Sequence, residues 1–162
     1  MTMEKTQLRR KVLRDPVNLL AFGLGSGLTP VAPGTAGSLV GLALAWGTLE
    51  LPTTARILVG IALIVSGIWI CGESARRIAV HDHPGIVWDE IAGIYLALLV
   101  APPSIWAWAL GFGLFRLFDI WKPWPIRDLD HRLKGGLGIM LDDLVAALYA
   151  AILLGFGGWL MF

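Results

Sequence analysis

The stretch that decides the fold is Ile86-Val87-Trp88-Asp89-Glu90, which continues into the apolar segment Ile91 to Ala101 and stops at Pro102-Pro103. The apolar segment alone falls short of the roughly 17–25 residues that cross a bilayer. It approaches that length only with Ile86, Val87 and Trp88 included, which draws the carboxylates of Asp89 and Glu90 into the interfacial zone. Proline lacks an N–H group and clashes with the preceding turn, so the pair ends the helix. The sequence predicts a membrane helix that begins at two acids and ends in a tight hairpin.

Apolar runs separated by breaks extend over the rest of the chain. With 56% hydrophobic residues and a mean hydropathy of +0.71, it is more apolar than a soluble domain, where such residues make up roughly 45–50%. We therefore expect an all-α fold, an integral membrane helical bundle with about four to five spans. The other runs are Gly34 to Leu51, Ile57 to Gly72, Ile105 to Trp121 and Ile139 to Phe162, with a break at Leu51-Pro52-Thr53-Thr54.

The N-terminal residues differ from this pattern. Residues 1–14 are expected to form a basic cytoplasmic arm, and residues 15–162 a single membrane-embedded domain. Asp15 to Leu28 is expected to be a short helix that lies on the membrane or re-enters it. A secretory signal is disfavoured, because the apolar stretch Val17 to Leu24 is short and leads into glycines rather than a cleavage site.

Charge is distributed unevenly along the chain, although the net charge is only +1. If Met1 to Arg14 is cytoplasmic, all of the 13 Lys and Arg residues except Arg56 fall on the inside. This asymmetry follows the positive-inside rule. It places the acidic blocks of the chain at the cytoplasmic surface.

The segment Gly23 to Ser38 is rich in glycine, proline and hydroxyl residues and leads into the first long apolar run. Free backbone N–H groups at a helix start, with the Thr35 and Ser38 hydroxyls beside them, suit an anion such as phosphate. No Walker-type lysine follows the glycines. A loop of small residues that permits close packing therefore stays open as the simpler interpretation.

Acidic residues gather next to the apolar runs. His81-Asp82-His83 and Asp89-Glu90 flank the turn Pro84-Gly85, and Asp142-Asp143 opens the last run. The helix dipole stabilises acidic side chains in the first turn of a helix, and this is the simpler explanation for the position of Asp89-Glu90. Burial of Asp142-Asp143 without a partner would be costly, and a divalent cation shared with Asp89, Glu90 or Asp119 would compensate for it. Oxygen donors favour Mg²⁺, and the histidine spacing does not suit zinc.

Arg116, Asp119 and Lys122 follow one another at intervals of three and share one helix face. An intrahelical ion pair is one interpretation. The other is a phosphate site, with cationic donors for the oxygens beside an acid. The single Cys71 lies inside an apolar run, so neither a disulfide nor a cysteine nucleophile is expected.

Four motifs occur in a fixed order from about Asp15 to Ala147. They are Gly25-Ser26-Gly27-Leu28-Thr29-Pro30 with Pro33-Gly34-Thr35, Val80-His81-Asp82-His83 with Ile86 to Glu90 and Gly93, Phe115-Arg116 with Asp119 and Trp121 to Ile126, and Gly135-Gly136 with Gly138-Ile139-Met140 and Asp142-Asp143. Together they resemble the phosphatidylglycerophosphatase A family. The resemblance implies Mg²⁺-dependent removal of the terminal phosphate of phosphatidylglycerophosphate, which gives phosphatidylglycerol. It also implies a multi-pass protein of a bacterial inner membrane whose active site faces the cytoplasm.

Roles for single residues follow from charge and spacing as hypotheses within this resemblance. His81 or Asp82 would protonate the departing glycerol oxygen or orient water. The expected metal ligands are Asp89, Glu90, Asp142 and Asp143. The expected catalytic residues are His81, Asp82, Asp89, Asp119 and Asp143. The expected phosphate-binding residues are Ser26, Gly34, Thr35, Arg116 and Lys122.

Three other functions compete with this one. An ion-coupled membrane transporter predicts charges at the bilayer midplane and an inverted repeat, whereas here the charges gather at one face. A membrane scaffold predicts no metal-dependent turnover, and a lipid phosphotransferase of the alcohol-phosphatidyl type lacks its signature here. The expected partners are the lipid substrate and the membrane, with no nucleic acid, and formation of a homo-oligomer is left open.

Overall fold

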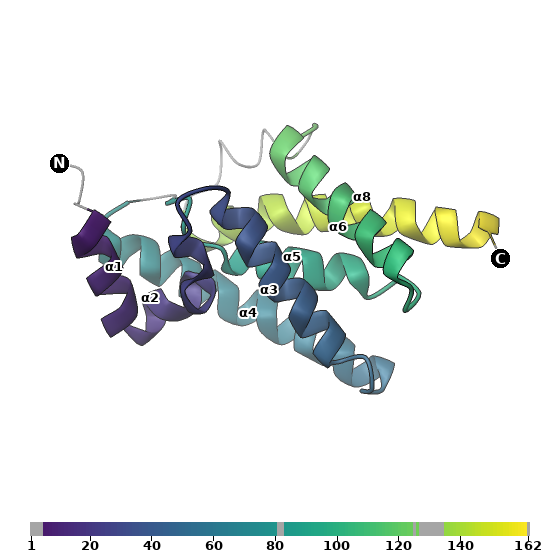
Figure 1. Ribbon diagram of the computed structural model, residues 1–162, viewed down its shortest axis with the longest axis horizontal. Coiled ribbons are helices and arrows are strands. Elements are labelled where there is room, and N and C mark those ends of the chain that lie inside the picture. The colour runs from purple at the N-terminus through teal and green to yellow at the C-terminus, as the bar shows by residue number, and fades with distance from the viewer. Residues whose placement is uncertain (1–4, 81–82, 125, 127–134, 162) are drawn as a thin grey trace.

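The computed structural model describes residues 5–80, 83–124, 126 and 135–161. The described residues form helices and connecting loops without any strand, which confirms the all-α prediction (Figure 1). The helices are α1 (Lys5–Arg14), α2 (Pro16–Ala21), the 3-10 helix η1 (Gly23–Leu28), α3 (Pro33–Gly47), α4 (Thr53–Ile78), α5 (Trp88–Leu98), α6 (Ile105–Trp121) and α8 (Gly136–Met161).

Prolines set most of the helix boundaries. Helix α3 begins at Pro33 and α4 begins directly after Pro52, positions at which a missing N–H group costs nothing. The pair Pro102-Pro103 lies between the end of α5 and the start of α6, as the sequence predicts. Lys122 ends α6 with a φ of 47°, and the backbone turns there before Pro123.

Helix α5 is the core of the bundle. It packs against α3, α4, α6 and α8, and Figure 1 shows it in the middle of the ribbon between these helices. Glycines allow the closest approaches: a Cβ atom at Gly41 of α3 would lie 2.6 Å from the Ile91 carbonyl oxygen, and one at Gly93 would lie 2.6 Å from the Phe115 ring. The side chains of α5 from Ile91 to Tyr95 are all buried, so little of this helix can face lipid.

The outward faces of the other helices are apolar. The described part of the chain has two helices long and apolar enough to cross a membrane, Thr53–Ile78 and Gly136–Gly157. Helices α3, α5 and α6 have 15, 11 and 17 residues, so the expected count of about four to five spans stays a prediction. Both long helices fit a membrane protein, as do the exposed apolar side chains Leu39 and Trp46 on α3, Leu58 and Val65 on α4, Trp106 and Leu110 on α6, and Ile152 and Phe156 on α8.

The expected interfacial or re-entrant segment is divided into α2 and η1. The backbone between them kinks at Leu24 and Gly25, which have φ values of 56° and 99°. Glycines of η1 press this segment onto the start of α5: a Cβ atom at Gly27 would overlap the Gly85 carbonyl oxygen, and one at Gly23 would lie 2.9 Å from the Val87 side chain. The Val87 N–H group also donates to the Ala21 carbonyl oxygen at 2.8 Å.

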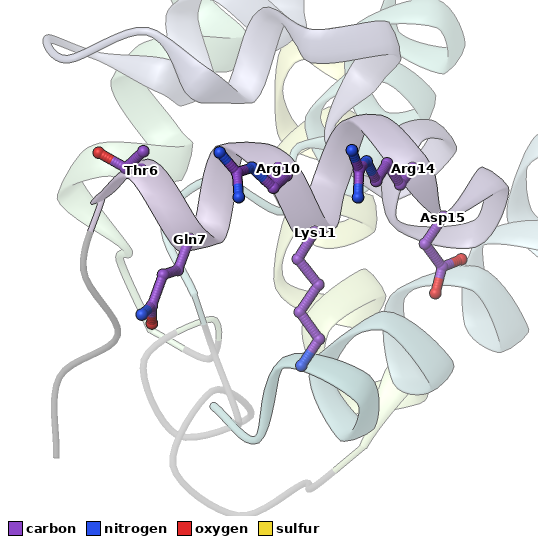
Figure 2. A pocket seen from close by; sticks show the side chains of 6 residues that line it. All are labelled: Thr6, Gln7, Arg10, Lys11, Arg14 and Asp15. Carbon is purple, nitrogen blue, oxygen red and sulfur yellow. The ribbon is translucent and has the colours of Figure 1, made fainter.

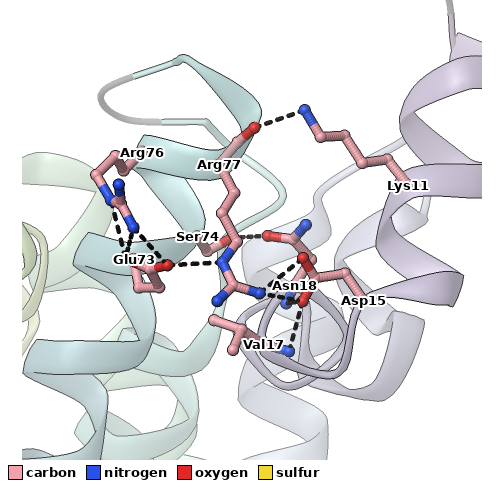
Figure 3. Close-up of polar contacts among 8 residues, drawn as sticks. All are labelled: Lys11, Asp15, Val17, Asn18, Glu73, Ser74, Arg76 and Arg77. Atoms are coloured by element: carbon pink, nitrogen blue, oxygen red, sulfur yellow. Dashed lines mark hydrogen bonds and ion pairs between the residues drawn. The ribbon is translucent and has the colours of Figure 1, made fainter.

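Helices α1 and α2 are tied to the end of α4 by polar contacts, which we call the Arg77 network (Figure 3). The Arg77 guanidinium donates to both oxygens of Asp15, at 2.7 and 2.8 Å, and to Glu73 at 2.7 Å. Lys11 donates to the Arg77 carbonyl oxygen at 2.5 Å. Asp15 also caps α2, because its carboxylate accepts the Val17 N–H group at 3.0 Å.

A buried hydrogen bond lies next to this network. The Ser74 hydroxyl donates to the Asn18 side-chain oxygen at 2.9 Å, and both residues are fully buried. Since α2 leads into η1, and η1 lies against Gly85 and Val87, the Arg77 network is connected through these segments to the residues that precede α5.

Candidate functional site

Three acids from two helices come together at one end of the bundle. Asp89 and Glu90 lie in the first turn of α5, and Asp143 lies near the start of α8. One carboxylate oxygen from each residue lies within 4.8 Å of the others. We call these residues the acidic cluster. They could hold a metal ion, and the sequence predicts all three of them as ligands.

The acidic cluster is enclosed by protein. Asp143 is 2% exposed and Asp89 is 9% exposed. Asp89 Oδ1, Glu90 Oε2 and Asp143 Oδ2 are buried and have no hydrogen-bond partner among the described residues. Buried carboxylate oxygens without a donor are costly unless a cation compensates for them. This donor set fits Mg²⁺, which prefers hard oxygen ligands and is usually held by one or two carboxylates together with water and substrate phosphate.

Arg116 of α6 closes one side of the acidic cluster. Its guanidinium forms an ion pair with Asp119 and lies 4.0 Å from Glu90 Oε1. It also donates to the Ser38 hydroxyl of α3 at 3.4 Å. The intrahelical ion pair that the spacing of three allows is therefore present, but the same side chain also joins α3 and α5. Asp119 in turn lies beside Asp143.

The start of α3 lies directly against these side chains. A Cβ atom at Gly34 would overlap Glu90 Oε1 and would lie 3.1 and 3.2 Å from the two Arg116 Nη atoms. Only glycine lets the backbone approach so closely. Because the first N–H groups of a helix have no intrahelical acceptor, this helix end is suited to an anion beside the acidic cluster. Thr35 follows in the same turn and is half-buried.

Lys122 and Asp142 form a second pair next to this centre. The Lys122 ammonium donates to Asp142 Oδ2 at 2.7 Å, so α6 and α8 are joined by an ion pair. Lys122 makes this contact from a left-handed backbone conformation directly after the last helical residue of α6. Asp142 lies outside the three residues of the acidic cluster, so its role as a metal ligand stays a prediction.

The remaining predicted residues lie around the loops of this end. Ser26 lies in η1 with a buried hydroxyl that has no partner among the described residues. His83 Nδ1 accepts the Gly85 N–H group at 3.0 Å, which holds the turn before α5. His81 and Asp82 lie outside the described residues.

Ser38 is the residue that the predicted phosphate-binding set omits. Its side chain is fully buried, donates to the Gly34 carbonyl oxygen at 2.9 Å and accepts from Arg116. The signal was its position four residues after Gly34, which places both residues on one face of the helix.

A family model described as phosphatidylglycerophosphatase A matches residues 19–157. The chain belongs to the phosphatidylglycerophosphatase A family. The matched region contains all three residues of the acidic cluster together with Gly34, Ser38 and Arg116. The resemblance stated from the motifs is thus confirmed.

Individual relatives agree with this family assignment. The chain is 44% identical over 150 residues to a protein of Escherichia coli (strain K12) named phosphatidylglycerophosphatase A, covering 92% of this chain and 87% of the relative. It is 45% identical over 151 residues to a protein of the same name from Haemophilus influenzae, covering 92% and 93%. A protein of Bacteroides thetaiotaomicron, provisionally named phosphatidylinositol-3-phosphatase, is 38% identical over 152 residues, covering 88% and 94%. No solved structure matches the chain.

Proposed function

We propose that this protein is a Mg²⁺-dependent phosphoric monoester hydrolase that removes the terminal phosphate of phosphatidylglycerophosphate and leaves phosphatidylglycerol in the membrane. The observation that carries the proposal is the acidic cluster, three buried carboxylates beside Arg116 and the start of α3. Relatives named phosphatidylglycerophosphatase A support the substrate. No finding supports an ion-coupled transporter. By the distribution of basic residues, the site faces the cytoplasm from a bacterial inner membrane.

Asp89, Glu90 and Asp143 would hold the metal, with Asp142 supporting them from the adjacent position. A bound Mg²⁺ supplies positive charge against the phosphate oxygens and makes a water molecule more acidic. Because the cluster is buried, its charges are screened less than they would be in water. The carboxylates would therefore hold a cation directly beside the position of the substrate phosphate.

Arg116 and the first turn of α3 would bind the phosphate oxygens. The guanidinium presents a fixed fork of donors to an oxyanion, and Asp119 keeps that fork in place. The N–H groups after Gly34, with the Thr35 and Ser26 hydroxyls, would supply neutral donors from the other side. Lys122 would add a second cation once Asp142 shares its charge with the metal.

Hydrolysis breaks the bond between phosphorus and the glycerol oxygen. Water supplies the oxygen that joins phosphorus, one of its protons passes to a carboxylate, and the departing glycerol oxygen needs a proton in return. Asp119 and Asp143 lie side by side and would accept the first proton. His81 or Asp82 would donate the second, as the sequence predicts.

Phosphate release from phosphatidylglycerophosphate, measured on purified protein in detergent, tests the proposal. We expect turnover with Mg²⁺ that stops in EDTA and falls at least about a hundredfold in Asp89→Asn, since the residue is placed in the reacting centre. Glu50→Gln is the matched control, because this exposed acid lies in the loop after α3, at the end opposite Gly34. Turnover that is unchanged in EDTA, or equal in Asp89→Asn and Glu50→Gln, would contradict the proposal.

A further inference from the structure

A groove of about 830 Å³ lies beside the candidate active site. It is bounded by α1, by the segment from Leu24 to Pro33 and by the turn His83 to Gly85. We call it the α1 groove. Most of its side chains are apolar, and the one Lys or Arg side chain among its described lining residues is Arg9. It is thus a largely apolar surface with a cation at its edge.

The α1 groove is continuous with the active site along the chain. Pro33 lines the groove, and the next residue, Gly34, lies against Glu90 and Arg116. Gly85 also lines the groove, and α5 with Asp89 begins three residues later at Trp88. Since consecutive Cα atoms lie 3.8 Å apart, two parts of the groove wall lie within a few residues of side chains at the candidate active site.

Leu24, on the apolar side of the α1 groove, has an exposed side chain and an unfavourable backbone conformation. Its side chain is 68% exposed, and its φ of 56° lies in the left-handed region that bulky residues avoid. A leucine held in this conformation with most of its surface uncovered by the protein gains little from packing inside it. Contact with an apolar molecule in the groove would account for both features.

We propose that the α1 groove binds the diacylglycerol part of the phospholipid substrate, with Arg9 paired to the phosphodiester that links the two glycerol units. The assignment rests on the proposed function. Phosphatidylglycerophosphate carries a phosphodiester and a terminal phosphomonoester separated by one glycerol. Arg9 at the groove and Arg116 at the acidic cluster offer one guanidinium to each, while Leu13 and Leu24 contact the acyl-glycerol part.

The test compares two neighbouring arginines of α1. Arg9 lines the α1 groove, whereas Arg10 lines a separate basic hollow with Arg14 and Thr6 (Figure 2). Both are exposed, and Arg9→Gln and Arg10→Gln remove the same charge from the same helix. We expect Arg9→Gln to raise the KM for phosphatidylglycerophosphate about tenfold or more, as the loss of a charged hydrogen bond does, and Arg10→Gln to change it less than about twofold. Equal effects of both variants would mean general attraction to an anionic surface and would overturn the proposal.

A second pair of variants tests the apolar wall without disturbing the fold. Leu24→Asn should fold well, because asparagine accepts the left-handed conformation, yet it should raise the KM for the lipid. Val31→Asn is the control, since Val31 is 79% exposed in the connection between η1 and α3 but does not line the groove. Val31→Asn should keep the wild-type KM for the lipid. A Leu24→Asn enzyme with the wild-type KM for the lipid would overturn the proposal.

A measurement without turnover separates this inference from the proposed function. Photoactivatable phosphatidylglycerol, which keeps the phosphodiester and lacks the terminal phosphate, should form adducts on α1 and on the segment from Leu24 to Pro33, and fewer in Arg9→Gln. Adducts there without any phosphatase activity would leave the groove in place and refute the enzyme. Phosphatase activity with adducts confined to other helices would refute the groove and leave the enzyme in place.

Discussion

At the scale of single residues, the acidic cluster lowers the stability of the metal-free protein and favours the binding of a cation. Asp143 is 2% exposed, and its Oδ2 atom has no hydrogen-bond partner among the described residues. Carboxylates gathered in a buried space repel one another, and a cation turns that repulsion into attraction. Loss of one acid should therefore raise the melting temperature of the protein in EDTA and lower the stabilisation that Mg²⁺ provides.

Asp143→Asn is the first prediction. Without metal, the variant should melt about 2 °C or more above wild type, because one buried charge is removed. Mg²⁺ should raise the melting temperature of wild type and have little effect on the variant, and phosphate release should nearly vanish. Thermal unfolding in EDTA and in Mg²⁺ measures this. A wild-type protein with the same melting temperature in both solutions would show that the three acids do not bind the cation.

Arg116→Lys is the second prediction. Arg116 contacts both Asp119 and Ser38 through its Nη1 atom, so the other nitrogens of its planar fork can face an oxyanion. Lysine keeps the charge but has a single nitrogen for all of these contacts. We expect kcat/KM to fall about a hundredfold at unchanged expression and melting temperature. A kinetic comparison with wild type decides it. If Arg116→Lys keeps full activity, the arginine serves only as the ion-pair partner of Asp119.

The acidic residues of the candidate site could be predicted from the sequence, whereas several of the contacts between side chains could not. Asp89, Glu90 and Asp143 could be identified because acids are rare inside apolar runs. The pairing of Lys122 with Asp142 could not, because it depends on a left-handed residue at the end of α6, and helical spacing continues the helix past that point. The sequence places the Ser38 hydroxyl near a helix start, but its contact with Arg116 depends on how α3 packs on α6.

At the scale of helices, the start of α3 approaches the side chains of α5 and α6 very closely. Its Gly34 lies against Glu90 and Arg116, so α3, α5 and α6 meet at a point with no room for a side chain. The prolines and apolar runs of the sequence were sufficient to predict these helices within a few residues. They could not show that α5 is the central helix, because the same apolar composition suits a helix that packs against protein and one that faces lipid.

Gly34→Ala is the third prediction. Alanine suits a helix better than glycine, so the variant should stay folded, but its methyl group would push against the Glu90 carboxylate and the Arg116 guanidinium. We expect at least a tenfold loss of kcat/KM, about 1.4 kcal/mol in the barrier. Gly47→Ala at the other end of α3 is the control, since no atom lies within 4 Å of its added methyl group. Equal activity of the two variants would show that the approach of α3 is not needed for turnover.

At the scale of the whole molecule, the Arg77 network joins the N-terminal helices to the bundle. Asp15 and Arg77 are 62 positions apart and form a two-oxygen ion pair. The hydrogen bonds from Arg77 hold the pKa of the Asp15 carboxyl below its ordinary value of 3.8. No local pattern in the sequence indicates this pair, because it links two segments that only the fold brings together.

Asp15→Asn is the fourth prediction. A carboxyl whose pKa is lowered by folding stabilises the protein above its unfolded pKa and loses that contribution as the pH falls through the folded value. The variant should therefore melt below wild type at pH 7, and the difference should shrink as the pH falls below about 4. Melting curves across this range measure it, and a difference that stays constant with pH would show that capping of α2, rather than charge, accounts for the effect. Arg77→Gln should also lower the melting temperature, whereas Arg76→Gln should not, since the Arg76 side chain is 77% exposed and pairs with Glu73 on its own helix.

The shortness of α5 has a consequence for how the chain enters a bilayer during synthesis. With 11 residues, α5 rises about 16 Å, roughly half the hydrocarbon thickness, and it opens with two acids. A translocon that samples nascent segments one at a time passes long apolar stretches such as α4 into lipid, but gains little by releasing α5 alone. Helix α5 would then leave the translocon paired with α6, and its remaining side would stay uncovered until α8, which follows α6 in the chain, packs against it.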